Sequence, residues 1–176
     1  ILTLPLAGAL RRLLPHVEVV WICRPYALPV VAKSKVVHTI RVWEEANMDA
    51  EVEESLFAGV DAVVFAFPEP RLLAAAARAG VRVRVATGRR WVAFRWANRR
   101  MWRSRKRTPE HETAQGLRLL HGLGLPARWH FPEREDWMDL LEWHTSSAGD
   151  PVPEGLKGAV LLHPGNHGSV SYTHLR

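Results

Sequence analysis

The chain alternates between short apolar runs and longer segments in which apolar residues recur at helical spacing. The runs are rich in β-branched residues, and the first of them is apolar at nearly every position, which is typical of a parallel strand buried on both faces. They cover residues 17–23, 36–42, 60–67 and 81–85. Segments predicted to be helical lie before, between and after them, at residues 1–15, 25–32, 49–58, 71–79, 109–121 and 136–144.

Proline and glycine mark the ends of several predicted helices. Pro5 falls in a first turn, where proline is tolerated, and Pro15 ends that helix. Gly59 and Gly80 each follow a predicted helix directly, as residues that adopt a left-handed conformation commonly do. Because helices and strands alternate, the sequence predicts an α/β fold: a Rossmann-like, doubly wound, mostly parallel sheet joined by crossovers.

Composition places the chain among ordinary globular proteins. Of its 176 residues, 47% are hydrophobic and 24% are charged, and no apolar run reaches the roughly 18 residues that a membrane-spanning helix needs. The single cysteine, Cys23, excludes an internal disulfide framework. Because Cys23 closes an apolar run, we expect it to be a small buried core residue.

The net charge of the chain indicates which kind of binding partner it favours. A formal net charge of +6 and a pI of about 10.2 favour a polyanion. Nucleic acid, an anionic membrane surface and a phosphorylated ligand all satisfy this criterion.

The segment at residues 88–107 concentrates this charge. It holds nine basic residues and no acidic one, with Trp91, Phe94, Trp96 and Trp102 interleaved. Basic groups beside stacking rings suit a nucleic-acid groove, and arginine pairs with phosphate or carboxylate in general. A solvated basic loop whose aromatics pack on the core is the third interpretation.

Two strand ends are candidates for ligand contacts. Arg71 lies where the strand at 60–67 gives way to a helix, and open α/β sheets bind ligands at the carboxyl ends of their strands; a surface arginine in a turn fits the same spacing. The sequence "HPGNHG" follows the apolar run at 159–162, where glycines and backbone N–H groups could cradle a phosphate.

Histidine spacing gives no support for a metal site. His163 and His167 are four residues apart, but Pro164 and Gly165 disfavour the helix that would bring them together. The sequence therefore predicts neither a metal nor a cofactor.

Taken in order, several segments resemble one known family. They are "ILTLPLAGALRRLLP", "VEVVWICRPYALPV", "DAVVFAFPEPRLLAAAARAGVRVRVATGRRW", "ANRRMWRSRKRTPEHETAQGLRLLHGLGL" and "VLLHPGNHGS". The ordered set resembles the ADP-heptose:lipopolysaccharide heptosyltransferases, glycosyltransferase family 9. The resemblance covers residues 1–169 approximately.

The resemblance implies the N-terminal half of a GT-B glycosyltransferase, in which two Rossmann-like domains face each other across a cleft. Residues 1–145 would form the acceptor-side domain without its first strand, and 146–158 the interdomain linker. Residues 159–169 would begin the donor-binding domain, and 170–176 depart from the family pattern and are expected to be a non-native tail.

The implied reaction is inverting transfer of a heptose, or a related sugar, from a nucleotide sugar to a lipopolysaccharide inner-core acceptor. ADP-heptose is the expected donor substrate. The family's general base is an aspartate in a turn before the helix that resembles "ILTLPL", and that turn has no counterpart here. We therefore name no catalytic residue and expect the chain alone to be inactive.

The resemblance also assigns binding residues. Those expected to contact the acceptor are Arg71, Arg99, Arg100, Arg103, Arg105, Lys106 and Arg107. Those expected to contact the donor's phosphates are His163, Gly165, Gly168 and Ser169.

The implied location is the cytoplasm, with peripheral contact at the inner face of the bacterial inner membrane, where a basic surface helps against anionic lipid. The partners would be the lipopolysaccharide core or lipid A precursor and the nucleotide sugar. The alternative from another class is a basic nucleic-acid-binding α/β module that uses residues 88–107.

Overall fold

The computed structural model describes residues 3–88, 91–101, 112–125 and 140–141. The chain divides into two compact units, Ile1–His144 and Thr145–Arg176, and every described residue belongs to the first. The expected linker, the start of the donor domain and the tail lie outside the described residues, as does the predicted helix at 136–144 apart from Leu140 and Leu141.

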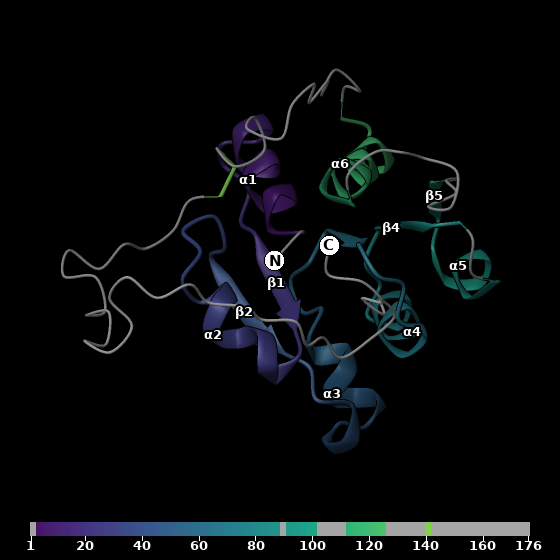
Figure 1. Cartoon of the computed structure of the whole chain (residues 1–176). Helices are drawn as coiled ribbons and strands as arrows, with labels where there is room; N and C mark the ends of the chain where they lie inside the picture. The colour runs from purple at the N-terminus through teal and green to yellow at the C-terminus, as the bar shows by residue number, and fades with distance from the viewer. Residues whose placement is uncertain (1–2, 89–90, 102–111, 126–139, 142–176) are drawn as a thin grey trace, which may run out of the picture. The chain divides into compact units, whose positions relative to one another are not determined.

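Helices and strands alternate along the first unit, as the hydrophobic pattern predicts (Figure 1). The α-helices are α1 (Leu4–Leu13), α2 (Leu28–Val31), α3 (Ala50–Ser55), α4 (Pro70–Arg78), α5 (Trp91–Trp96) and α6 (Glu112–Leu117). The strands are β1 (Val20–Cys23), β2 (Thr39–Val42), β3 (Ala62–Phe65), β4 (Val83–Thr87) and β5 (Arg99–Met101). Short 3-10 helices are η1 (Pro25–Ala27), η2 (Glu45–Asn47) and η4 (Arg118–Leu123).

All described strand pairs are parallel, which confirms a Rossmann-like α/β fold with crossover connections. The strands form two sheets, one with the order β1-β2 and one with the order β3-β4-β5. In the second sheet, Arg99 of β5 pairs with Val85 of β4, and Arg100 pairs with Ala86. The basic strand β5 therefore lies beside the carboxyl half of β4.

Each sheet has helices on both faces, and the hydrophobic core clusters show which helices cover which face. Along β3, Phe65 joins the cluster formed by α4, α5 and the two residues that follow α3, whereas Val64 packs against the cluster that contains α1, α6 and η4. Figure 1 shows α1 and α6 on one side of the strands and α3 and α4 on the other. Leu10 of α1 also packs against a third cluster, with Val19 just before β1.

Local signals explain several boundaries. The Asp49 side chain accepts a hydrogen bond from the Val52 backbone N–H at 2.9 Å and so caps α3. Gly80, at φ +76°, follows α4, and Gly59, at φ +72°, lies between α3 and β3, and only glycine adopts such a conformation without strain. Pro70 occupies the first turn of α4, where its missing N–H has no intrahelical role.

Burial differs from the prediction in the first sheet. All four residues of β1 are half-buried, including Cys23, although their apolar sequence predicts a strand buried on both faces. In contrast, Val85 and Ala86 of the central strand β4 are completely buried. The difference has a simple cause: among the described strands, β4 has a partner on each side, whereas β1 is paired only with β2.

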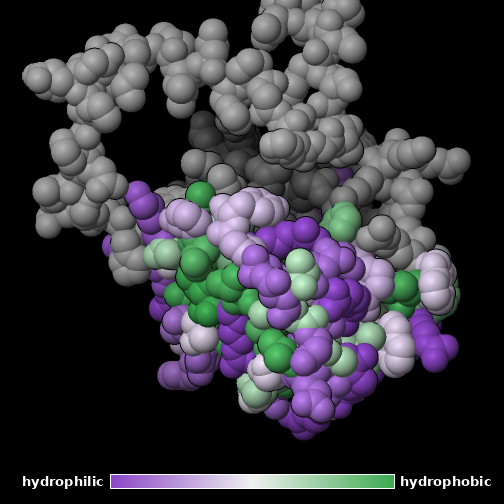
Figure 2. All heavy atoms as spheres, turned by 90° about the horizontal axis from the view of Figure 1, so that it is seen from below, coloured by the Kyte–Doolittle hydropathy of each residue, from purple (hydrophilic) through white to green (hydrophobic). Residues whose placement is uncertain are grey.

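The described helices do not include one with the length and hydropathy that a membrane span requires. The face seen in Figure 2 is largely hydrophilic, with hydrophobic side chains gathered in a limited area among them. The apolar residues of this unit are used chiefly to pack helices against strands.

Candidate ligand site at the carboxyl edge of the sheets

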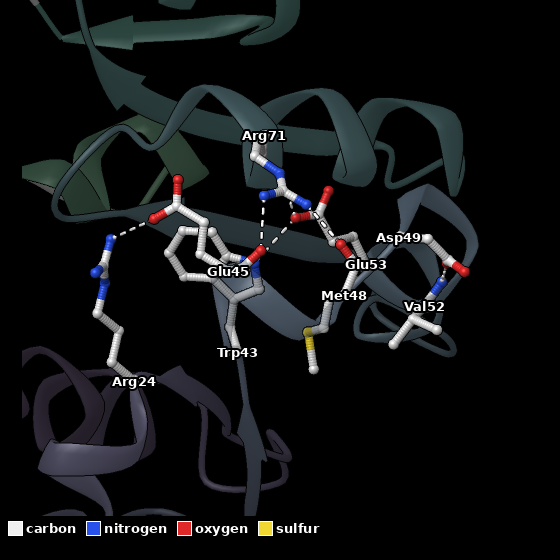
Figure 3. Close-up of polar contacts among 8 residues, drawn as sticks. All are labelled: Arg24, Trp43, Glu45, Met48, Asp49, Val52, Glu53 and Arg71. Atoms are coloured by element: carbon white, nitrogen blue, oxygen red, sulfur yellow. Dashed lines mark hydrogen bonds and ion pairs between the residues drawn. The ribbon is translucent and has the colours of Figure 1, made fainter.

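Side chains from three strand ends meet at the carboxyl edge of the sheets. Arg24 directly follows β1, Trp43 directly follows β2, and Arg71 lies in the first turn of α4, after β3. This edge is where open α/β sheets bind their ligands. The cluster of Arg24, Trp43, Glu53 and Arg71 (Figure 3) is called the edge cluster below.

Glu53 is the centre of the edge cluster. Its side chain is only 4% exposed, and its carboxylate lies 2.8 Å from the Arg71 Nε atom. The Trp43 indole N–H donates a hydrogen bond of 3.0 Å to the same carboxylate. A buried carboxylate requires such partners because burial without them is very unfavourable.

All three guanidinium nitrogens of Arg71 contact other groups of the protein. Besides the Glu53 ion pair, its Nη1 atom donates to the Glu45 carbonyl at 2.9 Å, and its Nη2 atom to the Met48 carbonyl at 2.6 Å. Three contacts from one planar group hold η2 and α3 against α4 (Figure 3). The structure thus gives Arg71 a positioning role at the edge, with 39% of its side chain exposed.

Arg24 extends the edge cluster toward solvent. Its guanidinium carbon lies 4.9 Å from the centre of the Trp43 ring, and its Nη2 atom lies 3.3 Å from the Glu45 carboxylate. Arg24 and Glu45 are about half exposed, so this ion pair is well screened by water. Stacking on the ring fixes the direction of the arginine.

Cys23 lies beside Arg24, and its surroundings make its thiol less reactive. Burial raises the pKa of the thiol above its ordinary value. A higher pKa leaves less thiolate, which is the reactive form. This agrees with the packing role expected from the sequence, although the side chain is half-buried rather than fully buried.

A second group of exposed basic and aromatic residues lies on α5 and β5, beside β4. We call Trp91, Phe94, Arg95, Arg99 and Arg100 the α5–β5 surface; every one of them is exposed. Trp91 is 76% exposed, and Phe94 is 50% exposed. No acidic residue occurs between residues 91 and 101.

Within the α5–β5 surface, cations stack on rings. The Arg100 guanidinium carbon lies 4.8 Å from the centre of the Phe94 ring, and its Nη1 atom donates to the Phe94 carbonyl at 3.3 Å. Arg95 stacks in the same way on Trp96, at 4.9 Å. Stacking leaves the edge of a guanidinium open to an anion, so this surface can bind phosphate or carboxylate.

Of the predicted acceptor residues, the structure places Arg71 at the carboxyl edge, and it places Arg99 and Arg100 on β5, beside the carboxyl half of β4. The other expected acceptor residues, Arg103, Arg105, Lys106 and Arg107, lie outside the described residues. The expected donor residues, His163, Gly165, Gly168 and Ser169, lie outside them as well. In the described ranges, no group of three or more His, Cys, Asp or Glu side chains could hold a metal ion.

Sequence reasoning did not single out Glu53, Trp43 or Arg24. A signal for Glu53 is present: it is three residues before Leu56 and four before Phe57, so it shares the apolar face of α3. A charged residue on an apolar helical face requires a buried partner. The identity of that partner depends on tertiary contacts, which spacing alone does not give.

We compared the chain with protein-family models, with curated proteins and with solved structures, and none of the three comparisons found a match. The function is therefore inferred from the fold, the charge and the residues at the carboxyl edge.

Proposed function

We propose that this chain is the acceptor-binding part of a glycosyltransferase that uses a nucleotide sugar and resembles the lipopolysaccharide heptosyltransferases. The observation that carries the proposal is the position of Arg99 and Arg100. Both are exposed on β5, the strand that pairs with the carboxyl half of β4, and open α/β sheets bind their ligands at the carboxyl ends of their strands. An inner-core acceptor bears carboxylate and phosphate groups, which arginine binds through paired hydrogen bonds.

The roles of the arginines differ in this proposal. Arg99 and Arg100 would contact the acceptor's anionic groups directly. Arg71 would act mainly by positioning, because three of its N–H donors are directed to Glu53 and to two backbone carbonyls. The transferred sugar, ADP-heptose as donor, and the GT-B arrangement of the whole enzyme belong to the same proposal.

Titration of the chain with a deacylated inner-core saccharide, followed by calorimetry, tests the proposal. Replacing both residues, Arg99→Gln and Arg100→Gln, should weaken binding at least about tenfold, because each charge-assisted hydrogen bond contributes roughly 1.5–3 kcal/mol. Arg82→Gln is the matched control: it removes a charge just before β4, at the opposite edge of the sheet, where Arg82 pairs with Asp61. Equal losses in both variants, or no binding by the parent chain, would contradict the proposal.

The second candidate is a nucleic-acid-binding module. The exposed rings of Trp91 and Phe94 beside Arg95, Arg99 and Arg100 favour it, because bases stack on such rings while arginines follow the backbone. Filter binding of single-stranded DNA across a salt series separates the two candidates. Tight binding with a steep salt dependence, and no response to the core saccharide, would favour the module.

A further inference from the structure

Arg24 is the arginine of the edge cluster that keeps most of its hydrogen-bond donors available. A guanidinium carries five N–H donors. Within the described part of the chain, the Arg24 side chain donates one hydrogen bond, from Nη2 to the Glu45 carboxylate at 3.3 Å. Arg71 differs, because each of its three guanidinium nitrogens already contacts Glu53 or a backbone carbonyl. An incoming anion therefore finds available donors on Arg24 rather than on Arg71.

The Trp43 ring holds the Arg24 guanidinium in place. The guanidinium carbon lies 4.9 Å from the centre of the ring. The ring itself is fixed, because Trp43 is only 3% exposed and its indole N–H donates to the buried Glu53 carboxylate. A cation stacked on a fixed ring loses little further freedom when it binds an anion. Stacking covers a face of the guanidinium and leaves its N–H edge open.

Arg24 also lies where a ligand can reach it. It directly follows β1, at the carboxyl edge where open α/β sheets bind their ligands. Its side chain is 49% exposed. Figure 3 shows Arg24 extending from the end of β1 to the carboxylate of Glu45. Position and exposure therefore make Arg24 an accessible and oriented cation.

The Glu45 carboxylate occupies the anion position beside Arg24. Its 3.3 Å distance to Nη2 is longer than the roughly 2.7–2.9 Å of a strong charge-assisted hydrogen bond. Arg71 holds the Glu45 backbone carbonyl at 2.9 Å, so the backbone at this position is fixed. The Glu45 side chain is 50% exposed and can turn into water by a change of rotamer alone. Glu45 is thus a weakly held internal ligand of Arg24.

An internal carboxylate favours one class of external anion. A ligand carboxylate would replace one carboxylate by another and would lose its translational freedom on binding. A phosphate monoester carries close to two negative charges at pH 7 and has three acceptor oxygens. Two of these oxygens match the paired N–H groups of a guanidinium. A phosphoryl group therefore competes with Glu45 better than a carboxylate does.

From these observations we propose that Arg24, stacked on Trp43, is a binding site for a phosphoryl group, and that Glu45 closes this site when no phosphoryl group is bound. On binding, the Glu45 carboxylate turns into solvent and the phosphate oxygens accept from the Arg24 N–H groups. This inference does not rest on the proposed function, which depends on Arg99 and Arg100.

Titration of the complete chain with methyl phosphate, followed by NMR, tests the proposal. The Arg24 Nε–H signal and the Trp43 indole signal should shift together, with a Kd on the order of millimolar. Arg24→Gln should weaken binding at least about tenfold, because the charge-assisted hydrogen bonds are lost. Glu45→Gln should tighten binding about two- to fivefold, because the internal competitor loses its charge. Acetate should bind the parent chain more weakly than methyl phosphate does.

The Arg82–Asp61 pair provides matched controls. It is also an exposed ion pair, at 3.1 Å, but it lies just before β3 and β4, at the opposite edge of the sheet. Arg82→Gln and Asp61→Asn remove the same charges as the two test variants. Neither should change the affinity for methyl phosphate, because water and salt screen charges at that distance.

Two further ligands identify the source of the phosphoryl group. Glucose 6-phosphate carries it on a sugar, and AMP carries it on a nucleotide. If one of them binds more tightly than methyl phosphate and loses this affinity in Arg24→Gln, the site is supported and its ligand class is known. Equal affinities for all three compounds support recognition of the phosphoryl group alone.

Three outcomes would overturn the proposal. The first is binding that Arg24→Gln leaves unchanged, or no shift of the Arg24 signal in either the parent chain or Glu45→Gln. The second is an equal loss in Arg24→Gln and Arg82→Gln, which would show a response to net charge only. The third is a Glu45→Gln variant that binds no more tightly than the parent chain, which would show that Glu45 does not close the site. None of these results affects the saccharide titration of the Arg99 and Arg100 variant.

Discussion

At the residue scale, one buried carboxylate organises the carboxyl edge. Glu53 accepts from the Trp43 indole and pairs with Arg71, and Arg71 in turn holds two backbone carbonyls. Each of these groups gives a hydrogen-bond or ion-pair partner to a polar group that would otherwise be buried without one. The edge cluster thus has a structural role independent of any ligand, and that role can be measured as stability.

Arg71→Ala should lower the free energy of unfolding by about 2 kcal/mol, because the buried Glu53 carboxylate loses its counter-charge. The value is below the usual cost of breaking a buried pair because 39% of the Arg71 side chain is exposed. Arg71→Lys should restore little of the loss, since an ammonium group cannot make the three-sided contact. Urea unfolding followed by circular dichroism measures these differences.

Arg82→Ala is the matched control for that measurement. Arg82 forms an ion pair with Asp61, and the two side chains are 80% and 83% exposed. The change should therefore lower the free energy of unfolding by at most about 0.5 kcal/mol. An Arg71→Ala variant as stable as Arg82→Ala would show that Glu53 does not depend on Arg71.

At the scale of elements, the hydrophobic pattern predicted most helices and strands but not their partners. β1 to β4 and α1 to α4 fall inside the predicted ranges or extend one or two residues beyond them, because apolar periodicity reflects which face of an element is buried. α5 and β5 were not predicted, since arginines interrupt their apolar positions and the segment resembles a basic loop. The division into two sheets was also beyond prediction, because strand order depends on contacts distant in sequence.

Packing of η4 on β4 gives a prediction at this scale. A Cβ atom added to Gly122 would lie 2.4 Å and 2.9 Å from the two methyl carbons of Val85, which is completely buried. Gly122→Ala should therefore lower the free energy of unfolding by roughly 1–3 kcal/mol through overpacking. Thermal unfolding by calorimetry measures the change.

Gly116→Ala in the neighbouring helix α6 is the control. A Cβ atom there would meet nothing within 4 Å, and Gly116 does not have a positive φ. Alanine should then stabilise the helix by about 0.5–1 kcal/mol. If both glycine variants change stability equally, η4 does not pack on Val85 as described.

At the scale of the whole molecule, the net charge and the exposed α5–β5 surface both favour binding to an anionic membrane surface. The chain carries a formal net charge of +6, and its α5–β5 surface presents arginines stacked on aromatic rings. Exposed tryptophan and phenylalanine beside arginines are suited to the boundary between lipid headgroups and acyl chains. The proposed glycosyltransferase function would use such contact, because a glycolipid acceptor remains in a membrane.

The chain should therefore bind vesicles that contain phosphatidylglycerol and sediment with them at about 50 mM salt, where charge attraction is weakly screened. Most of this binding should be lost at about 500 mM salt, because the Debye length becomes shorter than the distance between surface charges and headgroups. Trp91→Ala should reduce the vesicle binding that remains at high salt, because that residual binding depends on insertion of the Trp91 ring. Tyr26 is an exposed aromatic residue outside the α5–β5 surface, so Tyr26→Ala should leave the residual binding unchanged. Equal binding to vesicles of phosphatidylcholine alone would contradict an electrostatic origin, and an unchanged Trp91→Ala variant would exclude the α5–β5 surface as the contact.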